Sequence, residues 1–304
     1  DVTGPGRVCT DSDNNGLWTG LVLTAEYFRD NATTTAGAQD PSTVSSELFS
    51  GQSLLHNITG YKGLCARSAC GPTDLECAPG RNQDLDPACK STPATCGLQW
   101  RNATEATGYG DGWVWKSDTS SDEIDGHILG LSTVSELSSS TEESTLARDL
   151  IVNLVERIVD GGFNLIDWTG KPTTWGRWSP SDINDGTDYT DEHGVNALEM
   201  ITNLVAGIAA AKQDHPEQLA KFTAALANLT KPLPGPDYYS NLINLRIQVP
   251  WDENFSDDEL IMVPFLSLIL LDKLSPVTAV DMDQIRDALY HVWQLVAPGR
   301  SSLW

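Results

Sequence analysis

The sequence predicts an all-α fold, an (α/α) toroid or solenoid of about four helical hairpins. Four segments begin with polar or acidic residues and then turn apolar at helical spacing, and a loop and a second helix-like segment follow each of them. Apolar residues at i, i+3 and i+4 indicate a helix that packs on one face. Helical hairpins repeated in series are typical of α/α solenoids and toroids.

The predicted elements follow from this pattern in order. The first helices of the four hairpins are expected over residues 16–29, 121–131, 191–211 and 256–273. The second helices are expected over residues 42–58, 142–160, 216–229 and 279–296. Strand signals are sparse, and the best candidate is 241–249, where β-branched residues precede Pro250.

A cysteine-rich segment interrupts the helical pattern. Residues 65–96 are rich in Gly, Pro and Asp and poor in apolar residues, so we interpret them as a disulfide-stapled loop insertion within a single domain over residues 1–304. The even cysteine count and the irregular spacing, without a CxxC pair, favour disulfides over a zinc site. Six cysteines allow 15 pairings, so the connectivity is open. The cysteines are Cys9, Cys65, Cys70, Cys77, Cys89 and Cys96.

Glycosylation sequons and charge predict a secreted, extracellular glycoprotein. Five sequons accompany the cysteines, at Asn31, Asn57, Asn102, Asn228 and Asn254. The chain carries 42 acids against 19 bases, a net charge of −23 that repels nucleic acid and anionic membranes. No apolar run reaches the roughly 18 residues of a membrane-spanning helix, so we expect no membrane span.

The stretch "WKSDTSSDEIDGH" (residues 115–127) is the strongest candidate site. Ser120 and Glu123 form a capping box, and acids at a helix start favour the helix dipole. Capping does not explain the remaining charge, namely Asp118, Asp122, Asp125 and His127. Glu123 and His127 are four residues apart and share a helix face. A second acidic helix start, "FSDDEL", contains Asp258 and Glu259.

Tryptophans gather near the starts of the first helices. Trp115, Trp175 and Trp178 are among ten in the chain, and a flat aromatic ring suits the C–H face of a sugar. Loop tryptophans also fill the space beneath loops. Glu192 and His193 follow at the next helix start, in "DEHGVNALE".

The segment "DSDNNG" (residues 11–16) resembles the start of a calcium loop. Asp11, Asp13 and Asn15 occupy the first three ligand positions, but Val22 stands where a bidentate Glu is needed. A helix cap is therefore favoured over a looser calcium site. We expect no required cofactor, and calcium is the one ion that the pattern admits.

Six segments in order resemble a known group of proteins: "NGLWTGLVLTAEYF", "GLCARS", "WKSDTSSDEIDGHILGL", "DWTGKPTTWGRWSP", "DEHGVNALEMITNL" and "FSDDELIMVPFLSLILL". The chain is similar to large, mostly bacterial secreted proteins whose helical part looks like the six-hairpin glycosidase toroid. This resemblance implies inner helices that carry their acids to one mouth. With four hairpins, the chain corresponds to an incomplete six-hairpin barrel, completed by other residues or by another copy.

Two functional hypotheses follow. The first is binding or cleavage of a glycan or polysaccharide by a glycoside hydrolase or a polysaccharide lyase. Hydrolysis needs two carboxyls across a sugar, from Asp122 or Glu123 on one hairpin and Asp258, Glu259 or Glu192 on others. His127 or His193 is the candidate base of a lyase. The candidate substrate-binding residues are Trp115, Lys116, Asp118, Arg67, Trp175, Arg177 and Trp178.

The second hypothesis is a non-catalytic structural or assembly glycoprotein of a matrix, wall or surface filament. Its partners would be other copies or other extracellular glycoproteins. The sequons, the acidic surface and the cysteine-rich insertion favour this hypothesis, in which the acids serve as helix caps or as calcium ligands.

Overall fold

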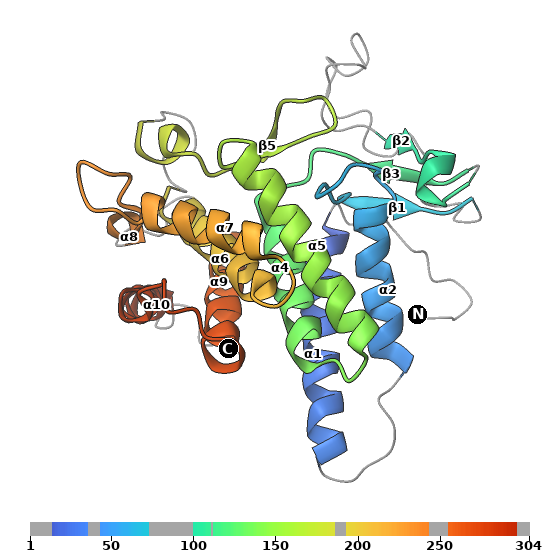
Figure 1. Cartoon of the computed structure of the whole chain (residues 1–304), viewed down its shortest axis with the longest axis horizontal. Helices are drawn as coiled ribbons and strands as arrows, with labels where there is room; N and C mark the ends of the chain where they lie inside the picture. The colour runs from blue at the N-terminus through green and yellow to red at the C-terminus, as the bar shows by residue number, and fades with distance from the viewer. Residues whose placement is uncertain are drawn as a thin grey trace.

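Four helical hairpins follow one another in the part of the chain that the structure describes, as the apolar periodicity predicts (Figure 1). The computed structural model describes residues 14–35, 43–72, 100–110, 112–185, 193–242 and 255–296, without the side chains of 33–35, 43, 255–259, 295 and 296. The helices pair as α1 (Asn15–Thr35) with α2 (Thr43–Asn57), α4 (Ser121–Leu137) with α5 (Thr141–Asp160), α6 (His193–Ala211) with α7 (Pro216–Leu229), and α9 (Phe255–Leu274) with α10 (Met282–Val296). Shorter helices are η2 (Glu105–Thr107), η3 (Ser181–Asp185) and α8 (Tyr238–Asn241).

Helix α4 lies at the centre of the packing. It contacts α1, α2, α5, α6 and α9, and residues 123–134 are all buried. Helix α9 touches both α4 and α6, and Leu17, Leu129 and Val263 join α1, α4 and α9 in one apolar cluster. In the described part of the chain, the first helices of the hairpins therefore pack on one another.

Helix α6 is the other core helix. Residues 194–211 are all buried, which suits a helix that is apolar around its circumference. Among the described residues, α6 is the one helix long and apolar enough to span a membrane, and its burial inside the protein is that of a core helix.

Among the described residues, two small sheets lie at one end of the molecule, at the top of Figure 1. Strands β1 (Ser68–Cys70), β3 (Val114–Lys116) and β2 (Trp100–Asn102) form an antiparallel sheet in the order β1-β3-β2. Strands β4 (Asn164–Ile166) and β5 (Pro172–Arg177) form an antiparallel hairpin. These strands were not predicted, because most are three residues long and too short to show an alternating pattern.

The predicted strand over 241–249 is not seen in the described residues. Its first residue, Asn241, is the last residue of α8, and residues 243–249 lie outside the described part.

The cysteine prediction needs a correction at one position. Cys65 is a free thiol and is fully buried, so the six cysteines do not all pair. Cys70 is disulfide-bonded. Cys9, Cys77, Cys89 and Cys96 lie outside the described residues, and the stapled insertion over 65–96 stays a prediction.

Candidate functional site

Strand β3 leads directly into the candidate stretch and fixes its first residues. Trp115 and Lys116 are both 2% exposed, so neither offers a free face to a sugar. Asp118 then takes a left-handed conformation with φ 59°. Its carboxylate accepts hydrogen bonds from Thr174 N at 2.7 Å and Thr174 Oγ1 at 2.8 Å, which ties β5 to the start of α4.

Arg67 holds the same segment from the other side. Its Nη1 donates to the carbonyl oxygen of Asp118 at 3.1 Å, and its Nη2 donates to Asn14 Oδ1 at 3.1 Å. Asp167 lies nearby, where burial and the charge of Asp118 raise its pKa to about 6. Two predicted substrate-binding residues, Arg67 and Asp118, thus have structural partners.

Glu123 caps a neighbouring helix instead of its own. Ser120 is the N-cap residue of α4, but its side chain makes no capping hydrogen bond. The carboxylate of Glu123 accepts instead from Gly16 N at 2.8 Å, in the first turn of α1. Burial and Asp122 raise the pKa of Glu123 well above its usual range, against the opposing effect of Arg67 and the α1 backbone. The predicted capping box is therefore wrong: the side chain of Glu123 caps the start of α1 and not that of its own helix.

Asp125 on α4 and Glu199 on α6 form a buried carboxyl pair. The two groups lie within hydrogen-bonding reach, and burial and the charge of Glu199 raise the pKa of Asp125. Two carboxylates offer no donor to each other, so the pair is hydrogen-bonded only when it holds a proton. Glu199 also accepts from Trp178 Nε1 at 2.7 Å. Trp178 is fully buried and thus joins α6 to the end of β5.

His127 lies at the centre of a second buried cluster. Its Nδ1 is 3.1 Å from His56 Nε2 and 2.6 Å from Gln52 Nε2, both on α2. Cys65 completes the cluster, and one potential ligand atom from each of His56, Cys65 and His127 lies within 4.8 Å of the others. Burial lowers the pKa of His56 to about 4, and burial and His56 lower the pKa of His127. Burial, followed by Glu123, raises the pKa of the Cys65 thiol.

The other predicted site residues lie apart from these two clusters or outside the described part. Asp122 is half-buried at the start of α4, and His193 is half-buried at the start of α6. Trp175 is 42% exposed on β5, near the half-buried Arg177. Glu192, Asp11, Asp13 and Asn254 and the side chains of Asp258 and Glu259 are not described.

Asn15, from the candidate calcium loop, has a side-chain partner, and the sequon asparagines that the structure describes lie at the surface. Asn15 Nδ2 donates to Ser68 Oγ at 2.8 Å, which joins the start of α1 to β1. The described sequon asparagines are all exposed, namely Asn31, Asn57, Asn102 and Asn228. Glycosylation at these positions stays a prediction.

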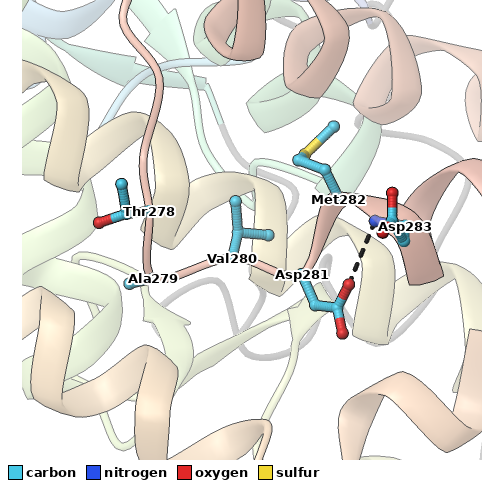
Figure 2. Close-up of a pocket in the computed structure, with 6 residues that line it drawn as sticks. All are labelled: Thr278, Ala279, Val280, Asp281, Met282 and Asp283. Carbon is cyan, nitrogen blue, oxygen red and sulfur yellow. Dashed lines mark hydrogen bonds between the residues drawn. The ribbon is translucent and has the colours of Figure 1, made fainter.

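Two surface cavities lie away from the predicted catalytic acids. One, of about 460 Å³, is formed by residues 278–283 between α9 and α10 (Figure 2). There Asp281 accepts from Asp283 N at 3.1 Å and caps α10. The other, of about 370 Å³, is lined by His56, Tyr61, Lys62 and Asn153, among others. Neither cavity is lined by a predicted catalytic residue.

The sequence offered little signal for the remaining cluster residues. Asp125 was among the charges of the candidate stretch that capping does not explain, but Glu199 was visible only as an acid among apolar helix residues, and His56 and Gln52 had no distinguishing pattern. Comparison of the chain with protein-family models, curated proteins and solved structures gives no match.

Proposed function

We propose that this chain is a non-catalytic extracellular glycoprotein whose helical hairpins, arranged as part of an (α/α) toroid, serve in assembly with other copies. The burial of two candidate catalytic residues, Glu123 and His127, carries this proposal. Both are fully buried, and Asp125 and Glu199, a carboxyl pair from two hairpins, are buried within hydrogen-bonding reach of each other. A glycosidase needs its carboxyls about 5 Å or more apart, with room for a sugar between them.

Exposed apolar side chains on the first and last inner helices support assembly. Trp18, Val22 and Phe28 are 44–50% exposed on α1, and Leu266 and Ile269 are 43% and 38% exposed on α9. In a series of hairpins each inner helix is covered by the next, and the end helices lack one neighbour. A second copy of the chain offers a helical hairpin of the same kind. Exposed apolar patches mark such interaction sites.

The test is the mass of the glycosylated chain, measured by light scattering over a range of concentrations. We expect oligomers that weaken when Trp18→Ser and Leu266→Ser are combined. Leu233→Ser is the matched control, because Leu233 is 80% exposed and belongs to the loop between α7 and α8, not to α1 or α9. A monomer at every concentration, or equal weakening by the control, would contradict the proposal.

Glycan binding is a second candidate function, favoured by the β4–β5 hairpin. Trp175 is exposed there, and Trp168 in the same hairpin stacks under the guanidinium of Arg101, 3.4 Å from the ring centroid. The exposed ring of Trp175 suits the C–H face of a sugar, and the positive charge of Arg101 at the same hairpin suits an acidic one. Binding to neutral and uronic-acid polysaccharides should be lost in Trp175→Ala, without release of reducing ends or unsaturated products. Unchanged binding by Trp175→Ala would exclude this hairpin.

A further inference from the structure

Four buried side chains with metal-binding atoms converge between α2 and α4. Gln52 and His56 come from α2, Cys65 from the segment after it, and His127 from α4. His127 and Cys65 are fully buried and His56 is 6% exposed. Three of the four are His or Cys, the stronger metal ligands. One ligand atom each of His56, Cys65 and His127 lies within 4.8 Å of the others.

We propose that His56, Cys65 and His127 bind one borderline-soft transition-metal ion, zinc or copper. Thiolate and imidazole are the ligands that these ions prefer. Zinc–nitrogen bonds of about 2.0–2.1 Å put two imidazole nitrogens about 3.3 Å apart in a tetrahedral site. His56 Nε2 and His127 Nδ1 are 3.1 Å apart. A small outward movement of the rings therefore accommodates the ion.

A hydrogen bond between the two imidazoles explains part of this geometry, but it leaves the amide that contacts His127 Nδ1 incompletely paired. Gln52 Oε1 is buried and makes no hydrogen bond. A buried polar atom without a partner is costly, so this one, next to the imidazole pair, points to a missing ligand. The amide of Gln52 can be turned, since its O and N are assigned from their surroundings. If the amide is turned, Gln52 Oε1 lies beside His127 Nδ1, where it is a weak fourth ligand for the proposed ion.

Glu123 lies beside the second ring nitrogen of His127. A Cβ added at Gly16 would collide with both Glu123 Oε2 and His127 Nε2, so the carboxyl lies on the Nε2 side of the imidazole, opposite His56. Ligating histidines usually direct their second nitrogen toward a carboxylate or carbonyl. Metal binding forms the metal–sulfur bond as the Cys65 thiol releases its proton to solvent. The charge of the ion then offsets that of the thiolate.

The cavity of about 370 Å³ provides a route for the ion. It opens to the surface and is lined by His56, one of the three proposed ligands. All ligands come from the protein, as in a structural site, and the ion would join α2 and the segment after it to α4.

The test uses the full chain freed of metal with a chelator. Elemental analysis after dialysis against Zn²⁺ should give one ion per chain, and calorimetry should give its Kd. Cys65→Ser and His127→Gln should weaken binding by more than the roughly 10- to 100-fold expected for loss of a group outside the ligand set. With Cu²⁺, a thiolate-to-copper absorption band should appear and be absent in Cys65→Ser, and competition with Zn²⁺ tells which ion is preferred.

His215→Gln is the matched control, because His215 is a partly exposed histidine that pairs with Asp149 on the surface. A second measurement needs no variant. Zn²⁺ at 100 times its Kd should slow alkylation of Cys65 in the wild-type chain about 100-fold. Peptide mapping measures the alkylated fraction of Cys65 over time. Failure to retain an ion, unchanged alkylation, or equal binding by Cys65→Ser would each overturn the proposal. Oligomeric state is not a readout here, so these results are independent of the proposed assembly.

Discussion

At the scale of single residues, the acids of the candidate stretch hold distant segments together. Asp118 binds the backbone and hydroxyl of Thr174, and Glu123 binds the first turn of α1. A buried carboxyl is stable only when donors or a proton satisfy its oxygens. Burial and the charge of Glu199 raise the pKa of Asp125, so we expect the Asp125–Glu199 pair to hold a proton and the stability of the fold to depend on pH.

Asp125→Asn tests this shared proton. Burial raises the pKa of Asp125 above 3.8, its ordinary value, so the folded chain holds a proton that the unfolded chain loses. The stability from this group is fully present below pH 3.8 and is lost as the pH rises toward the folded pKa. Asn supplies the donor at every pH, so urea unfolding of the variant should show a smaller loss of stability between pH 5 and pH 8.

Asp125→Ala is the companion variant. It leaves Glu199 beside a cavity with one donor fewer, and we expect a loss of about 3 kcal/mol in the free energy of unfolding at pH 7. Equal pH slopes for the wild type and Asp125→Asn would show that the pair holds no shared proton.

At the scale of elements, glycines set the distance between α1 and α4. Each helix has two glycines four residues apart, Gly16 and Gly20 on α1 and Gly126 and Gly130 on α4. A Cβ at Gly126 would collide with Leu17 Cα and lie 2.9 Å from Gly16 O. The close approach brings Gly16 N within reach of Glu123, so the packing of these helices creates the cap.

Gly126→Ala should therefore destabilise the fold, although alanine is the better helix former. Separation of the helices should cost about 2 kcal/mol or more, which outweighs the gain of roughly 1 kcal/mol in helix propensity. Gly51→Ala in α2 is the matched control, because a Cβ there meets nothing within 4 Å. This control should raise the free energy of unfolding by up to about 1 kcal/mol. Thermal and urea unfolding measure both, and a Gly126→Ala chain as stable as the control would contradict this account.

At the scale of the whole molecule, strong negative charge opposes the apolar faces of α1 and α9. The net charge of −23 makes two copies repel each other at low salt. Apolar burial between copies acts in the opposite direction and does not depend on charge.

Added salt should therefore strengthen self-association. The Debye length falls from about 30 Å at 0.01 M to about 8 Å at 0.15 M, so the repulsion is screened. Sedimentation velocity at these two salt concentrations should show a larger oligomeric fraction at 0.15 M. Dissociation on addition of salt would instead indicate an interface held by ion pairs.

The helices could be predicted from the sequence because their signals are local. Helix α7 spans Pro216–Leu229 as predicted, with Pro216 at its first position, and α4 begins at Ser121. The apolar period and the start signals lie within each segment. The mainly helical fold class and the series of hairpins were determined in this way.

Only the tertiary structure decided what the polar residues do. Glu123 meets Gly16 across 107 positions of sequence, and His127 meets Gln52 across 75. The sequence identified 115–127 as unusual, but a capping box and an open catalytic mouth fitted it equally well. Whether an acid is exposed to a substrate or buried against a backbone N–H depends on which helices pack together, and that is set by contacts between distant segments.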